Sequence, residues 1–238
     1  MKPTRRRVLS SCASTIAGLA GSKQLALSQI YSLDGLLDAF IDVRPSSGVI
    51  GGRRVEYWGY NGTLPGTILE TRAGDTLRVH LRNGLAEPTN LHFHGLHVSP
   101  SGNADNSFIE VPSGEQFDYE LQIPADHSPG TFWYHPHMHG ATARQGFRGL
   151  AGLLIVRGDL DTIPEIAAAQ EQVVVLQDFT VDRNGQIPEP NLSERMRGRE
   201  GSTLTVNGEV NPTFWIQRNG LLRCRFLNAS CSRYYLLT

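Results

Sequence analysis

The sequence of 238 residues contains few cysteines and no excess of charge of either sign. Three cysteines are too few for a disulfide framework, so Cys224 and Cys231 are expected to form one bridge or to remain buried thiols. A formal net charge of −1 does not favour a nucleic-acid partner. Composition and length together predict an ordinary globular chain of one or two domains.

No apolar run in the chain is long enough to predict a membrane-spanning helix. Residues 1–28 instead combine a basic start, including Arg5 and Arg6, with a short and weakly apolar segment. This pattern resembles a twin-arginine export signal, with an ordinary secretory signal as the alternative. We expect cleavage between Ala20 and Ser28 and location in the periplasm, or otherwise outside the cytoplasm.

Residues 40–158 have the pattern of a β-sandwich. Apolar and polar residues alternate in 75–83 and in 117–123, while 149–156 is continuously apolar. The first of these strands is expected to bury Leu77, Val79 and Leu81 on one face. Segments rich in glycine, proline and aspartate separate the strands. An all-β, antiparallel sandwich is therefore predicted.

Residues 159–171 are predicted to form a linker, and 172–238 the beginning of a second β domain. The segment "GLLRCRFLNAS" alternates, which places Leu222, Cys224 and Phe226 on one face and Arg223 and Arg225 on the other. About 70 residues are too few for a second complete sandwich of ordinary size, so we expect this domain to be incomplete in the chain.

Two His-x-His motifs dominate the polar residues: "LHFHG" contains His92 and His94, and "TFWYHPHMHG" contains His135 and His137. Residues i and i+2 of a strand point to the same face, so each motif aims two imidazoles in one direction. Two such strands side by side would bring four imidazoles together. Sites built only from imidazole suit zinc, copper, iron or nickel.

The other histidines are assigned structural roles. His80 lies on the polar face of its predicted strand and is interpreted as solvated. His97 has the opposite parity to the first motif, and His127 falls in a predicted turn. His139 shares the parity of the second motif, but Pro136 weakens strand geometry there. We interpret His139 as a supporting residue, with metal ligation the minority interpretation.

The segments "LHFHGLHV", "GTFWYHPHMHG" and "RGLAGLLIV", in this order, resemble the N-terminal cupredoxin domain of the laccase-like multicopper oxidases. The segment "LTVNGEVNPTFWIQ" and the following "LLRCRFLNAS" resemble the start of that family's second domain. The resemblance implies a cupredoxin-like, Greek-key β-sandwich followed by part of a second cupredoxin-like domain.

The same resemblance implies roles for individual residues. His92 is expected to bind the type 2 copper and His94 a type 3 copper, while His135 and His137 would both bind type 3 copper. Asp105, in "GNADNSF", stands where the family has an acidic residue that delivers protons to dioxygen. A plain turn aspartate is the alternative interpretation of Asp105.

Two features of the family are missing from this sequence. All eight histidines lie between residues 80 and 139, so the chain has two of the family's four His-x-His motifs. Neither Cys224 nor Cys231 is flanked by histidine, as the type 1 copper ligand would be. The chain is therefore expected to supply half of the trinuclear copper ligands and to be inactive without a C-terminal cupredoxin domain or a partner chain.

Three functions are compatible with these motifs. The leading one is part of a copper-dependent oxidase that couples one-electron oxidation of phenolic, other organic or metal-ion reductants to reduction of dioxygen to water. The second is a non-catalytic, copper-binding cupredoxin-like protein. The third is a zinc hydrolase with three histidine ligands, which no His-Glu-x-x-His motif supports.

Overall fold

The computed structural model describes residues 27–237, in which strands predominate. The strands are β1 (Gln29–Tyr31), β2 (Leu36–Ile50), β3 (Arg53–Tyr60), β4 (Gly66–Arg72), β5 (Thr76–Asn83), β6 (His92–His94), β7 (Gln116–Gln122), β8 (Gly130–His135), β9 (Gly152–Arg157), β10 (Gln170–Phe179), β11 (Thr203–Val206) and β12 (Leu222–Asn228). The helices are short: α1 (Thr142–Phe147), η1 (Asp159–Thr162), α2 (Pro164–Ala167) and α3 (Leu192–Arg197). The predicted all-β class is confirmed. The expectation of an antiparallel sandwich is only partly right, because β2 pairs with β5 and β4 pairs with β9 in parallel.

Two sheets form the sandwich. The four-stranded sheet has the order β3-β2-β5-β7 and the five-stranded sheet the order β1-β4-β9-β8-β6. Their facing surfaces share one apolar core, whose largest fully buried side chains include Tyr60, Tyr119, Tyr134, Phe93, Leu37, Ile41, Leu69, Leu77, Leu81 and Leu91. Burial of this apolar surface is the main favourable contribution to folding.

Strand β5 shows how the alternation of the sequence builds this core. Leu77, Val79 and Leu81 are buried as predicted, while the side chains between them lie on the outer surface of the four-stranded sheet. β5 pairs in parallel with β2 and antiparallel with β7, so it is central in its sheet. A central strand buried on one face is expected to show this period of two.

A close contact in the core depends on glycine. The ring of Tyr134 on β8 packs directly over Gly152 on the neighbouring strand β9, where any Cβ atom would overlap the ring. The Tyr134 hydroxyl donates a hydrogen bond of 2.6 Å to the carbonyl of Thr67. Because Tyr134 precedes His135, this packing fixes the end of β8 where the second histidine motif begins.

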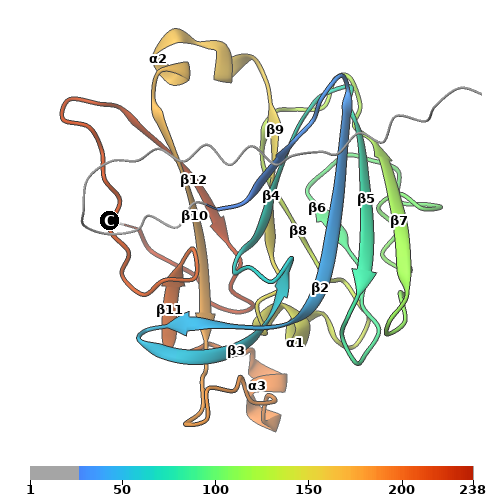
Figure 1. Cartoon of the computed structure of the whole chain (residues 1–238), viewed down its shortest axis with the longest axis vertical. Coiled ribbons are helices and arrows are strands. Elements are labelled where there is room, and N and C mark those ends of the chain that lie inside the picture. Colours follow the sequence, from blue (N-terminus) through green and yellow to red (C-terminus); the bar gives the residue numbers. More distant parts are fainter. Residues whose placement is uncertain (1–26, 238) are drawn as a thin grey trace, which may run out of the picture.

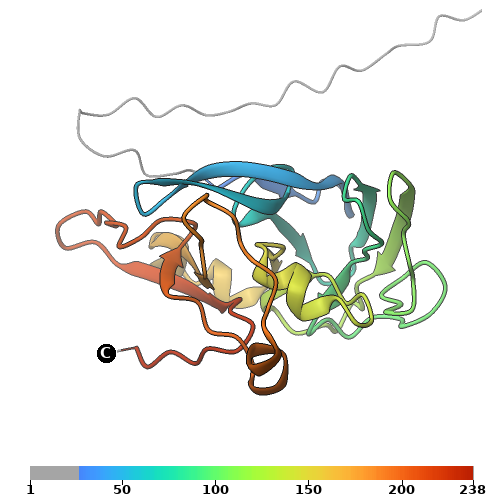
Figure 2. The same cartoon turned by 90° about the horizontal axis from the view of Figure 1, so that it is seen from below.

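The three-stranded sheet, with the order β11-β10-β12, packs against the opposite face of the five-stranded sheet. Figures 1 and 2 show the resulting layers, with β4, β8 and β9 between the other two sheets. The contact buries Ile68, Ala151, Leu153, Ile155, Val173, Val175, Leu227 and Ala229. Strands β1 and β2 start before residue 40, and η1 and α2 lie within 159–171. The proposed division into domains remains a prediction.

Strand β12 differs from its predicted orientation. Cys224 and Phe226 are exposed, whereas Arg225 and Leu227 face the five-stranded sheet and are 6% and 8% exposed. Arg225 is tolerated there because Nη2 donates a hydrogen bond of 2.9 Å to Asp161 Oδ1. Cys224 and Cys231 are both free thiols, so the single bridge considered from the sequence is not formed.

The predicted export signal at 1–28 lies outside the described residues, apart from Leu27 and Ser28. Within residues 27–237, no helix has the length and apolar character needed to cross a membrane.

Candidate metal centre

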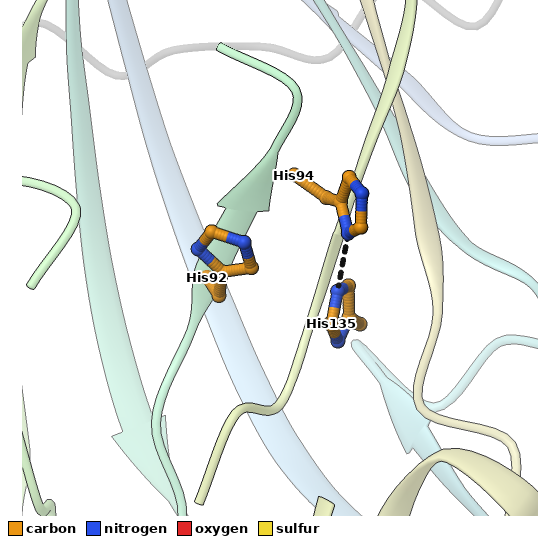
Figure 3. A group of neighbouring side chains, drawn as sticks. All are labelled: His92, His94 and His135. Atoms are coloured by element: carbon orange, nitrogen blue, oxygen red, sulfur yellow. Dashed lines mark hydrogen bonds between the residues drawn. The ribbon is translucent and has the colours of Figure 1, made fainter. Parts of the chain in front are cut away.

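Strands β6 and β8 bring the two histidine motifs together. They pair antiparallel at the edge of the five-stranded sheet, with His92 opposite His135 and His94 opposite Trp133. One nitrogen from each of His92, His94 and His135 lies within 4.8 Å of the other two (Figure 3). The expected convergence of imidazoles from two adjacent strands is therefore present for three of the four predicted ligands.

His135 is held in one ring orientation. Its Nδ1–H donates a hydrogen bond of 2.9 Å to the carbonyl of Pro136, so the lone pair is on Nε2. That Nε2 atom lies 3.2 Å from Nδ1 of His94 (Figure 3). The indole of Trp133 stacks on the His135 ring, with centroids 4.0 Å apart. The lone pair of His135 thus points toward His94 rather than toward the core.

Asp105 lies beside the first motif, in the loop between β6 and β7. Its Oδ1 accepts hydrogen bonds from His92 Nδ1 at 3.0 Å and from the backbone N–H of Phe93 at 2.9 Å. The Asp105 side chain is 10% exposed. This carboxylate favours the His92 tautomer with the proton on Nδ1, which leaves Nε2 free to bind a metal.

His137 reaches the site by a different route from the one expected. Strand β8 ends at His135, so Pro136 and His137 lie beyond the regular strand. The alternation of side chains along β8 therefore does not determine the direction of the His137 side chain. The His137 ring nevertheless lies 5.3 Å from the His92 ring. Its Nδ1 is buried without a hydrogen-bond partner among residues 27–237. The geometry therefore places His137 next to the three-nitrogen cluster rather than within it.

Two positioning residues were not recognised from the sequence. Asn90 is buried; its Oδ1 accepts the backbone N–H of His137 at 2.7 Å, and its Nδ2 donates to the carbonyl of Ile109 at 2.8 Å. Trp133 stacks on His94 as well as on His135. Both residues stand two positions before a motif histidine, a weak signal that gains meaning only once the strand register is known.

The remaining histidines lie away from the three-nitrogen cluster. His139 is exposed, and its ring lies 5.8 Å from that of His137, beside Phe108. His127 is buried in its turn, where Nε2 accepts the backbone N–H of His97. His80 lies on the outer surface of the four-stranded sheet. It is not simply solvated, because its two ring nitrogens contact carboxylates on both neighbouring strands.

Burial favours the neutral imidazole form of His94 and His135. Burial lowers the pKa of His135 to about 4; the Pro136 carbonyl opposes this shift, and the neighbouring His92 and His94 add to it. Burial, followed by the nearby His92, also lowers the pKa of His94. Neutral histidines can bind a metal without first losing a proton. A cluster of imidazole donors suits copper, and equally zinc, iron or nickel.

Comparison with known proteins shows which family has this arrangement of strands and histidine motifs. Residues 44–161 match the family model for multicopper oxidase. The chain is 32% identical over 177 residues to the multicopper oxidase mco of Staphylococcus aureus, an alignment that covers 74% of this chain and 38% of the relative. The family is therefore clear. This chain belongs to the multicopper oxidases.

Two further relatives sharpen the comparison. The structure of a multicopper oxidase from Campylobacter jejuni, described as a metallo-oxidase, superposes with a TM-score of 0.73 at 30% identity; the match covers 86% of this chain and 43% of that one. Cell division protein FtsP of Salmonella typhimurium is 33% identical over 190 residues, covering 78% of this chain and 39% of the relative. This multicopper oxidase chain thus spans about two fifths of the length of these curated relatives.

Proposed function

We propose that this chain supplies the N-terminal histidine ligands of a trinuclear copper centre. His92 would bind the type 2 copper, and His94, His135 and His137 the type 3 coppers. The observation that supports this proposal is the convergence of His92, His94 and His135 from two paired strands. Copper in such a centre supplies the electron storage needed to reduce dioxygen to water with four electrons.

The protein groups around the histidines prepare the site. Trp133 and the Pro136 carbonyl set the ring of His135, and Asn90 holds the backbone that bears His137. Asp105 holds the proton of His92 on Nδ1. We propose that this carboxylate also delivers protons toward dioxygen, because it is a nearly buried acid within hydrogen-bond distance of a ligand.

In this proposal, the complete protein oxidises phenolic, other organic or metal-ion reductants by one-electron steps. We further propose that it is exported, most simply to the periplasm by the twin-arginine route. The isolated chain would not turn over, because none of its cysteines has the flanking histidines of a type 1 copper site. A C-terminal cupredoxin domain or a partner chain would complete the centre.

A second candidate function is copper binding without catalysis. The Gallibacterium anatis cell division protein FtsP is 28% identical over 98% of this chain, so relatives of this chain include proteins that are not named as oxidases. Both candidates use the histidine site to bind copper, but only the oxidase reduces dioxygen. Copper binding alone therefore does not distinguish them.

Copper binding is tested first with histidine variants. We expect His135→Ala to lower the affinity for copper by more than about tenfold, because a ligand itself matters at least as much as its supporting contacts. His139→Ala, an exposed histidine close to the site, is the matched control and should retain affinity. Competition titration of the purified chain measures both. Equal affinities in the two variants would argue against the site, and zinc at full occupancy in purified protein would argue against copper.

The role of Asp105 is tested by two substitutions. Asp105→Ala removes the acceptor of His92 Nδ1 and should weaken copper binding by about 10–100-fold. Asp105→Asn retains an acceptor oxygen, so copper binding should persist while dioxygen reduction by the complete protein falls. Oxygen-electrode measurements with a phenolic reductant separate proton delivery from positioning. Turnover by the isolated chain would contradict the requirement for a further domain.

A further inference from the structure

A cavity of about 670 Å³ lies between α1, α3 and the segment that follows β12. Helices α1 and α3 lie near each other at one end of the molecule (Figure 1). The apolar wall of the cavity includes Ala143, Phe147 and Pro190, and its charged wall includes Arg199 and Glu194. The volume is within the range of cavities that bind small organic molecules. None of these residues belongs to the histidine site.

Arg199 is the most unusual residue of this cavity. It is only 7% exposed, and its guanidinium lies 3.9 Å from the centre of the Phe147 ring. Nη1 donates a hydrogen bond of 2.9 Å to the carbonyl of Pro188. Nε and Nη2 have no hydrogen-bond partner among residues 27–237. Buried charged donors are normally satisfied, so these two atoms call for a partner.

The carboxylates nearest to Arg199 are committed elsewhere. Glu194 Oε1 lies 3.4 Å from Arg199 Nε, too far for a good charge-assisted hydrogen bond. Its Oε2 accepts the backbone N–H of Asn191 at 2.8 Å in the capping box of α3, which holds the side chain back. Glu189 Oε1 accepts from Arg148 Nη2 at 2.8 Å. Neither group completes the shell of Arg199.

The two unpartnered atoms define the chemistry of a ligand. Nε and Nη2 form one edge of the guanidinium, and two parallel N–H groups on one edge match the two oxygens of a carboxylate. Stacking on Phe147 fixes the plane of this fork. Because Arg199 is buried from water, the pKa of its guanidinium is lowered. A bound carboxylate would accept hydrogen bonds from Nε and Nη2 of Arg199, and the apolar part of the same ligand would pack against Ala143 and Pro190.

We propose that this cavity is a binding site for a small organic carboxylate, anchored on Nε and Nη2 of Arg199. The site is independent of the copper ligands and of the function proposed for them. The cavity lining also includes Arg144 and Arg195, so the preference for a carboxylate over a tetrahedral anion rests on the two-donor fork of Arg199 and on the apolar wall.

Benzoate and its neutral isostere benzamide provide the direct test. We expect isothermal titration of the 238-residue chain to detect benzoate binding, with benzamide and inorganic phosphate at least about tenfold weaker. Arg199→Lys keeps the charge but loses the fork, so benzoate should bind at least about tenfold more weakly. Arg82→Gln, an exposed arginine on the four-stranded sheet, is the matched control and should bind benzoate normally.

Arg199→Gln is a second variant, expected to lose benzoate binding while its far-ultraviolet circular dichroism stays unchanged. If it fails to fold, the comparison of benzoate with benzamide on the unaltered chain still decides. Equal binding of benzoate and benzamide, or no binding of either, overturns the proposal. Phosphate binding as tight as benzoate overturns the preference for a carboxylate, and unchanged benzoate affinity in Arg199→Lys excludes the fork as the anchor.

Discussion

The sandwich core and the contact of the three-stranded sheet bury different kinds of side chain. Between the four-stranded and five-stranded sheets the buried cluster is almost wholly apolar. Between the five-stranded and three-stranded sheets a smaller apolar cluster lies beside a group of ion pairs. These ion pairs join Arg157, Arg223 and Arg225 to Glu70, Asp161 and Glu171.

Asp161 shows how the ionic contact is built. It lies in η1, where its carboxylate accepts the Gly158 N–H at 2.8 Å and contacts Arg157, Arg223 and Arg225. One acidic group at the turn between β9 and β10 thus connects the edge of the sandwich to β12. Strand β12 can therefore face its neighbouring sheet with arginine because a turn far away in the sequence supplies the counter-charges.

The largest expected effect is a loss of stability, and its size should differ between the two apolar clusters. Leu154→Ala, in the fully buried sandwich core, should lower the free energy of unfolding by about 2–5 kcal/mol. Leu227 is 8% exposed in the smaller cluster, so Leu227→Ala should lower the free energy of unfolding by about 2 kcal/mol, the lower end of this range. Urea unfolding measures the difference. Hydrogen exchange should show lost protection in β2 and β5 for Leu154→Ala and in β10 and β12 for Leu227→Ala; identical patterns would contradict separate clusters.

A smaller effect is expected from the ionic contact, and it depends on pH. Partial burial alone would raise the pKa of Asp161, but the Gly158 N–H and the guanidinium groups of Arg223 and Arg157 lower it from 3.8 to about 2. The carboxylate therefore stabilises the fold fully above its unfolded pKa, and this contribution of about 2 kcal/mol is lost as the pH falls toward 2. Asp161→Asn should accordingly be destabilising at pH 7 and nearly neutral at pH 2 in chemical denaturation. A penalty independent of pH would indicate that the amide replaces the hydrogen-bond acceptors poorly, rather than a loss of charge.

The smallest effect is expected on the outer surface of the four-stranded sheet. His80 Nδ1 contacts Asp118 at 2.7 Å and Nε2 contacts Asp38 at 2.9 Å, with Phe40 stacked on the ring. The hydrogen bond to Asp118 is the main reason that the pKa of His80 is raised above 6.5, with Asp38 adding to it against partial burial. The charged form stabilises the fold below the unfolded pKa, and this is lost as the pH rises through the folded pKa.

His80→Gln should therefore cost about 0.3–1 kcal/mol at pH 5.5 and less at pH 8.5. Thermal unfolding at the two pH values measures it. Arg82→Gln on the same strand is a control, because Arg82 forms no ion pair within residues 27–237, and an equal pH dependence in both variants would contradict the role of His80.

Periodicity alone was sufficient for most of the sandwich. The alternation in β5 and the continuous apolar run of β9 predicted buried faces that the structure confirms. The same rule was wrong for β12, where Phe226 is exposed and Arg225 is buried. The reason is that the rule counts apolar residues and contains no information about carboxylates at a distant turn, such as Asp161.

The histidine motifs also show the limit of what a local sequence pattern can predict. Their spacing predicts that the four motif histidines approach one another, because strand parity is a local property, and His92, His94 and His135 form the observed cluster. It could not predict that β8 ends at His135, that Asn90 holds His137, or that Asp105 contacts His92 from a loop. Each of these contacts joins segments whose separation in space depends on how the sheets pack.

The sequence by itself determined the all-β class, the buried faces of the sandwich strands and the choice of histidines proposed as metal ligands. Those properties follow from the period of two along a strand and from the chemistry of imidazole. Only the tertiary structure decided the tautomer of His92, the position of His137 outside the strand and the orientation of β12. These depend on hydrogen bonds and ion pairs between residues far apart in the chain, which no local pattern encodes.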